Sequence, residues 1–110
     1  MPLTVKNVSL WRKEVENKTG VLAQTLEPLA KAGADLHVVM GFRYPGDETK
    51  AAVELYPISG EKSIAAAQQV GLSASAIPAL LVEGENKSGL GYAIAQAIAG
   101  AAVNLSFLVA

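Results

Sequence analysis

The residues of this chain that are best suited to binding a ligand lie in a short polar loop that occurs twice. Residues 17–20 (Asn-Lys-Thr-Gly) and 86–89 (Asn-Lys-Ser-Gly) each stand directly before an apolar, helix-forming stretch. A glycine at a helix start lets another group approach the backbone, and the first N–H groups of the helix lack partners within it. With the helix dipole, these N–H groups favour a carboxylate, while the Asn amide can accept from an ammonium group. The loop therefore suits a zwitterion; an ordinary cap and turn is the alternative interpretation.

The loops belong to a longer repeat with an offset of 69 residues. Residues 16–36 and 85–105 share seven identical positions out of 21, and several other positions hold similar residues. A repeat of this length indicates one supersecondary unit that is used twice. Whatever the loop binds, we expect it to bind at two related places.

Other candidates for chemistry are weaker. Glu14 and Glu16, like Glu83 and Glu85, are spaced by two residues, so each pair could hold a hard cation or transfer protons. Charges that keep a strand edge soluble are the favoured interpretation of these pairs. His37 is the single histidine and Cys is absent, which excludes a thiol nucleophile and a zinc–thiolate site. We therefore expect a protein that is not an enzyme, with no catalytic residue, no metal site and no cofactor.

Composition limits the partners. The 110 residues are enough for one small domain, and the nine basic and ten acidic residues are scattered and give a net charge of −1. A chain with so few aromatic residues and no basic stripe is not expected to bind nucleic acid. The N-terminal residues lack the apolar run of a signal peptide, which favours the cytoplasm.

The stretch from Ser88 to Ala110 contains no charged residue and has the length of a membrane span. Its composition is mostly Ala and Gly, with Gln96 and Asn104, and its repeat partner at 19–40 carries several charges. We therefore expect a buried helix followed by a strand, and no membrane interaction.

Hydrophobic periodicity and turn residues predict strands at 3–15, 36–42, 51–56, 77–83 and 103–109. They predict helices after Thr19 as N-cap, at 60–70 after Ser59 as N-cap, and within 84–102. The order βαββαβ is that of the ferredoxin-like unit, an antiparallel sheet with both helices on one face. We thus expect an α+β chain that forms one compact body. Its complete unit covers 1–83, and a partial αβ unit covers 77–110 and shares strand 77–83. Strands 77–83 and 103–109 would need a partner strand, supplied either by the rest of the fold or by another chain. This need favours an oligomer, and we expect a homodimer.

Residues 17–22 (Asn-Lys-Thr-Gly-Val-Leu), the apolar helix and residues 32–36 (Ala-Gly-Ala-Asp-Leu) together resemble the opening of an ACT domain. Residues 86–90 and 102–105 resemble it a second time. The resemblance implies a tandem, non-catalytic regulatory module that senses a free amino acid at an interface between ACT units. The ligand-binding residues that it implies are Asn17, Thr19, Gly20, Val21, Leu22, Asp35, Asn86, Ser88, Gly89, Leu90 and Asn104. The alternative is an oligomerisation or protein-interaction module without a small-molecule ligand.

Overall fold

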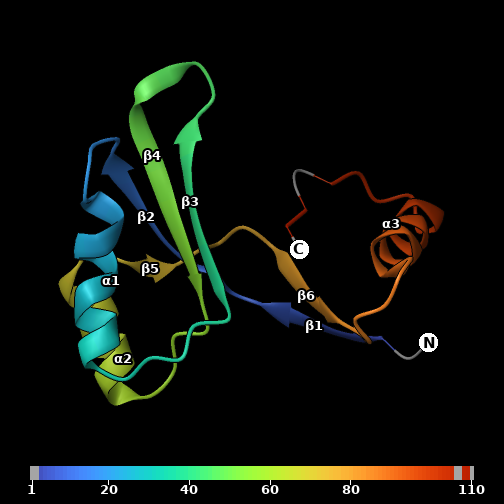
Figure 1. The fold of residues 1–110 in the computed structure, drawn as a ribbon, viewed down its shortest axis with the longest axis horizontal. Coiled ribbons are helices and arrows are strands. Elements are labelled where there is room, and N and C mark those ends of the chain that lie inside the picture. Colours follow the sequence, from blue (N-terminus) through green and yellow to red (C-terminus); the bar gives the residue numbers. More distant parts are fainter. Residues whose placement is uncertain (1–2, 106–107, 110) are drawn as a thin grey trace. The chain divides into compact units, whose positions relative to one another are not determined.

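The computed structural model describes residues 3–105 and 108–109 and has an α+β fold (Figure 1). Its elements, in chain order, are β1 Thr4–Val8, β2 Trp11–Glu16, α1 Val21–Lys31, β3 Val38–Tyr44, β4 Asp47–Tyr56, α2 Glu61–Gln69, β5 Ser73–Ala74, β6 Ala79–Glu83 and α3 Leu90–Gly100. They form two compact units. The large unit is Ser9–Ala79, and the small unit combines Met1–Val8 with Leu80–Ala110. The boundary between the units therefore differs from the predicted division into 1–83 and 77–110.

The large unit is a ferredoxin-like arrangement, as the sequence predicts. Its sheet has the order β3-β4-β2-β5, and every neighbouring pair is antiparallel. Helices α1 and α2 cover the same face of this sheet (Figure 1). Alternate residues of β4 point toward the helices, so Val53 and Leu55 pack with Leu29 of α1. The buried core is completed by Ala66, Ala67 and Leu72.

The hairpin between β3 and β4 is confirmed, with Gly46 at a φ of 78° in its turn. A positive φ of this kind is the conformation that glycine adopts at least cost. Strand β4 begins at Asp47, earlier than the predicted 51. Asp47 Oδ1 accepts hydrogen bonds from the Thr49 backbone N–H at 3.0 Å and from Thr49 Oγ1 at 2.6 Å, which fixes the chain as it leaves the turn.

The Asp47 contact predicts a pH effect on stability. The Thr49 hydroxyl, followed by the Thr49 backbone N–H, holds the pKa of Asp47 below its ordinary value. A lowered folded-state pKa stabilises the fold above the unfolded pKa, and this contribution is lost as the pH falls through about 4 and below. We expect Asp47→Asn to flatten the dependence of the unfolding free energy on pH in that window, measured by urea unfolding. An unchanged pH dependence would contradict this role.

The strand that closes the large unit differs from the predicted 77–83. Ser73 and Ala74 pair with β2, and the Ser75 N–H continues the ladder by donating to Leu10 O at 2.7 Å. The chain then turns away, because the Ile77 N–H donates to Ser75 Oγ at 3.1 Å and Pro78 has no N–H to donate. Strand β6 consequently pairs with β1 in a second sheet.

The predicted first strand, 3–15, is likewise two strands. Ser9 and Leu10 interrupt it: β1 belongs to the small unit, whereas β2 pairs with β4 and β5 in the large unit. The sequence does not reveal this change of partner, because no Gly or Pro between residues 3 and 15 marks a break.

Helix α3 of the small unit ends as α1 ends. Gly33 and Ala102 occupy matching positions of the repeat, and both have a positive φ, 78° at Gly33 and 59° at Ala102. Ala34 N donates to Leu29 O, and Val103 N donates to Ile98 O. The predicted strand 103–109 is absent from 103–105 and 108–109, while 106 and 107 lie outside the described residues. In the first copy of the repeat, the residues that correspond to 103–105 are 34–36, and they also precede the strand, which begins at Val38.

Within the described residues, no helix is long and apolar enough to cross a membrane.

Candidate functional site

The two repeated loops have the same backbone. Gly20 (φ 86°, ψ −6°) and Gly89 (φ 89°, ψ −3°) are both left-handed N-caps, of α1 and α3 respectively. The predicted N-cap Thr19 is therefore wrong by one residue, and the predicted Ser59 is likewise replaced by Gly60. No described side chain caps either of the two helices. The first N–H group of each helix donates to a carbonyl of the loop: Val21 N to Lys18 O at 3.4 Å, and Leu90 N to Lys87 O at 3.2 Å. The N–H groups of the next residues of the first turn are directed at the space before the helix.

The approach to each glycine is also shared. Lys18 N donates to Glu16 O at 3.0 Å, and Lys87 N donates to Glu85 O at 2.9 Å. The same residues form ion pairs through their side chains, at 3.0 Å and 3.4 Å respectively. The sequence repeat is therefore a structural repeat of loop and helix.

A cleft of about 590 Å³ lies at the first loop, inside the large unit. Four predicted site residues line it: Asn17, Gly20, Val21 and Leu22. The opposite wall comes from β3 and β4 and consists of Gly41, Phe42, Arg43, Ala51, Ala52 and Val53. The structure thus joins the loop to residues 41–43 of β3, the predicted second strand, and to β4, which was not predicted as part of the site.

Gly41 keeps the cleft open between α1 and β3. A Cβ at this position would lie 3.8 Å from Leu22 Cδ2, at ordinary contact distance. Any larger side chain would therefore extend into the space beside Leu22. A glycine inside an apolar strand marks a close approach of this kind, and it was the signal in the sequence for this wall of the site.

Asn17 links the loop to the start of β4 by two hydrogen bonds. Its backbone N–H donates to Thr49 O at 2.9 Å, and its side-chain Nδ2 donates to Glu48 O at 2.8 Å. These bonds fix the position of the side chain at the edge of the cleft. The amide oxygen Oδ1 is the group that can accept from a ligand.

The remaining predicted residues are not brought into this cleft. Thr19 is exposed and does not line it. Asp35 is also outside it, with Oδ2 at 3.6 Å from His37 Nε2 and a side chain that is 95% exposed.

The second set of predicted residues belongs to the small unit: Asn86, Ser88, Gly89, Leu90 and Asn104. The first four form the loop and the start of α3, and Asn104 follows the helix. The sheet of this unit consists of β1 and β6 in the described residues. The second loop therefore has no described counterpart of the wall that β3 and β4 give to the first.

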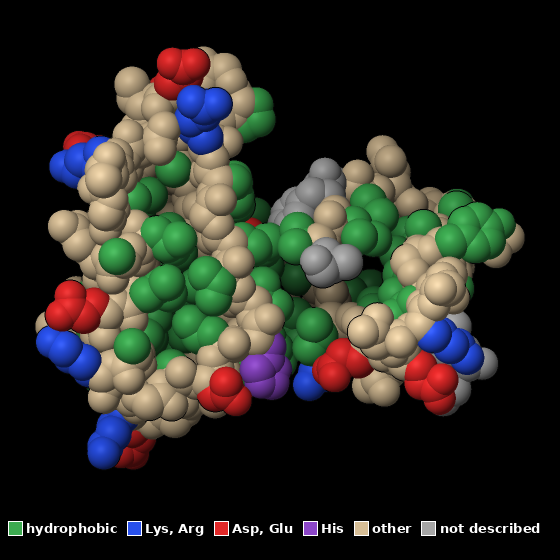
Figure 2. Space-filling view, in the orientation of Figure 1, with side chains coloured by type: hydrophobic (Ala, Val, Ile, Leu, Met, Phe, Trp, Pro, Cys, Tyr) green, Lys and Arg blue, Asp and Glu red, His purple; other side chains and the backbone are tan. Residues whose placement is uncertain are grey.

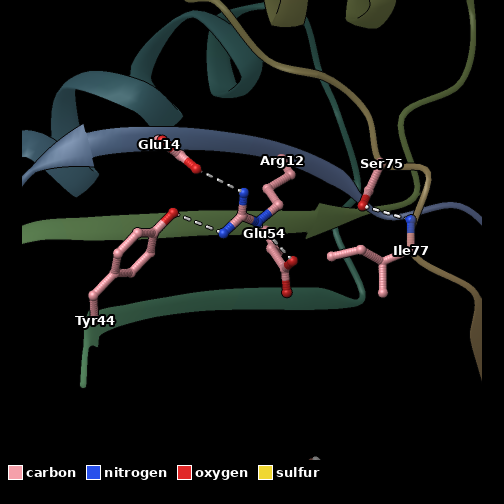
Figure 3. Close-up of polar contacts among 6 residues, drawn as sticks. All are labelled: Arg12, Glu14, Tyr44, Glu54, Ser75 and Ile77. Carbon is pink, nitrogen blue, oxygen red and sulfur yellow. Dashed lines mark hydrogen bonds and ion pairs between the residues drawn. The ribbon is translucent and has the colours of Figure 1, made fainter. Parts of the chain in front are cut away.

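An ion cluster on the sheet of the large unit was not predicted (Figure 3). The side chain of Glu54 is 4% exposed, and its Oε1 lies 3.2 Å from Arg12 Nε. Arg12 Nη2 donates to Tyr44 Oη at 2.9 Å, and Nη1 donates to Glu14 Oε1 at 3.4 Å. The Tyr44 hydrogen bond raises the pKa of Arg12, and Tyr44, followed by Arg12, lowers the pKa of Glu14. In the sequence, the indication of this cluster was Glu54, a single charged residue within the apolar part of β4.

Three of the four paired carboxylates form ion pairs with neighbouring cations. Glu14 contacts Arg12, Glu16 contacts Lys18, and Glu85 contacts Lys87. Across residues 3–105 and 108–109, no group of three or more His, Cys, Asp or Glu residues is placed to hold a metal ion.

No protein-family model matches the chain, and no curated protein matches it. The resemblance to ACT domains therefore rests on the residues quoted above.

Proposed function

We propose that the chain is a non-catalytic, cytoplasmic regulatory module that binds a free amino acid in the cleft at the first loop. The observation that carries this proposal is the position of the start of α1, which no described side chain caps, at the edge of a cleft with a mostly apolar lining. A volume of about 590 Å³ falls in the range of small-molecule sites, and few polar groups converge on it, as is typical of such sites.

The chemistry of the lining suggests an orientation for the ligand. The carboxylate would accept hydrogen bonds from the first N–H groups of α1, where the helix dipole also favours a negative charge. The ammonium group would donate to Asn17 Oδ1. An aliphatic side chain would lie beside Leu22 and Gly41. Binding would stabilise the arrangement of loop and strands that a regulated partner recognises.

An oligomerisation module without a ligand is the second candidate. It is favoured by the exposed apolar residues of the small unit, which suit a homodimer. The two candidates differ in what stabilises the protein: an amino acid in the first case, and protein concentration alone in the second.

A thermal-shift screen of the twenty amino acids tests the proposal. An amino acid at 100 times its Kd should add about 2.7 kcal/mol to the free energy of unfolding, which raises Tm by several degrees. Gly41→Leu should abolish the shift by filling the cleft, while the variant stays folded because leucine suits a strand better than glycine does. Val39→Leu, in the same strand but outside the cleft, is the matched control and should keep the full shift. The proposal fails if no amino acid raises Tm, or if Gly41→Leu responds as well as the wild type.

A further inference from the structure

The charges that line the cleft at the first loop are all of one sign. The lining includes two cationic side chains, Lys18 and Arg43, and no acidic one among the described residues. The first turn of α1, at the edge of this cleft, also lacks an acidic residue, whereas the first turn of α2 contains Glu61. An acidic residue in that turn is the usual counter-charge of the positive helix end. The cleft therefore offers positive charge, and no negative charge, to a molecule inside it.

The two cations differ in what they already contact. Lys18 Nζ lies 3.0 Å from Glu16 Oε2, so the charge of Lys18 is balanced within the loop. Arg43 forms no ion pair with any residue that the structure describes. The acidic residue at the far side of the hairpin turn, Asp47, accepts its hydrogen bonds from Thr49. Arg43 is therefore the cation of the cleft that is available to a ligand.

The pairing of the strands explains why no carboxylate of the sheet reaches Arg43. Arg43 lies opposite Ala51, and Ala51 lies opposite Val15 of β2, so the residues in its row across the sheet are apolar. Gly41, two residues earlier in β3, shares this face with Arg43, as does Val53 of β4. Figure 2 shows hydrophobic side chains on the visible face of the large unit between α1 and the strands, with charged side chains at the margin. The cleft thus combines an apolar floor with one free guanidinium.

We infer that the ligand of the cleft is an amino acid with an acidic side chain, and that Arg43 selects it. This inference rests on the proposed function, because it keeps the α-carboxylate at the start of α1 and the ammonium group at Asn17 Oδ1. Gly41 and Arg43 are about 7 Å apart along one face of β3. The methylene groups of glutamate would take the place of an aliphatic side chain beside Gly41, and the second carboxylate would reach Arg43.

A guanidinium is the group best suited to this selection. Its planar fork of N–H donors matches the two oxygens of a carboxylate, and such charge-assisted pairs are stronger than neutral hydrogen bonds. Glutamine has nearly the same size as glutamate, but its amide offers one uncharged acceptor in place of the carboxylate. The inference therefore predicts that the cleft distinguishes each acid from its own amide, and not by size.

Isothermal titration calorimetry of the full chain tests this selection with two pairs of ligands, glutamate with glutamine and aspartate with asparagine. We expect at least one acid to bind with a Kd about tenfold lower than that of its amide, a difference of about 1.4 kcal/mol. High salt should reduce this preference, since it screens the added charge pair. Arg43→Gln should make the two Kd values equal, and Arg43→Lys, which keeps the charge without the fork, should retain part of the preference.

Lys50→Gln is the matched control for the loss of a positive charge. Lys50 directly precedes Ala51 in β4, but it does not line the cleft, and successive side chains of a strand point to opposite faces. This variant should keep the full preference for the acid. Circular dichroism should show that both variants retain the fold of the wild type.

The outcomes separate this inference from the proposed function. Binding of amino acids with no preference for an acid over its amide would overturn the role of Arg43 and leave the proposed function standing. An unchanged preference in Arg43→Gln would show that this charge only keeps the edge strand β3 soluble, and an equal loss in Lys50→Gln would assign the effect to net charge. Either result would overturn the inference. If no amino acid binds, the inference and the proposed function are both wrong.

Discussion

Arg12→Ala is expected to lower the free energy of unfolding by about 3–5 kcal/mol, because it leaves the carboxylate of Glu54 buried without a cation. The Glu54 side chain is 4% exposed, and its Oε2 has no hydrogen-bond partner among the described residues. The 3.2 Å contact between Glu54 Oε1 and Arg12 Nε is therefore its principal compensation. The change also removes the hydrogen bond from Arg12 to Tyr44. Thermal unfolding should show a fall in Tm of at least about 12 °C.

Two variants separate this explanation from a simple loss of packing. Arg43→Ala removes an exposed arginine from β3 and should change the unfolding free energy by at most about 0.5 kcal/mol. Arg12→Met combined with Glu54→Leu replaces the buried ion pair by apolar side chains, which is often neutral or stabilising. If this double variant is no more stable than Arg12→Ala, the buried charge is not the cause of the loss.

Leu55→Ala is expected to cost about 2–5 kcal/mol, since it opens a cavity where the core is most tightly closed. Leu55 is 0% exposed and packs in one cluster with Leu29 and Leu72, so α1, β4 and the segment after α2 all lose contacts. Urea unfolding should show a lower midpoint with a similar slope.

Leu80→Ala is the matched control for the core. Leu80 also lies in a strand, but its side chain is 59% exposed in the small unit. We expect a loss well below that of Leu55→Ala. A comparable loss at the two positions would show that the core extends beyond the cluster of the large unit.

The sequence predicted those parts of the fold that depend on local signals. The repeat around Gly20 and Gly89 is a true repeat of loop and helix, since the same residues impose the same left-handed cap. The hairpin at Gly46 and the helix end at Gly71 follow from the positive φ that each glycine adopts. The antiparallel sheet with two helices on one face follows from the order of these elements.

Changes of strand partner could not be predicted. The segment 3–15 divides at Ser9, and the closing strand of the large unit is Ser73–Ala74, because tertiary pairing decides which edge each strand joins. The burial of Glu54 has the same origin: its environment comes from Arg12 on a neighbouring strand. At the candidate site, the sequence predicted the loop. It could not predict the cleft wall that contains Gly41, because that wall depends on the register in which β3 pairs with β4.

The most direct test of the proposed site is an amide chemical-shift titration by NMR with the amino acid that gives the largest thermal shift. We expect saturable changes at the backbone amides of Gly20, Val21, Leu22 and Gly41, which line the cleft. The matching amides of the second loop, at Gly89 and Leu90, should remain near their free positions. If no amide at the cleft moves, or if the changes centre on the second loop, the assignment of the binding site to the first loop is wrong.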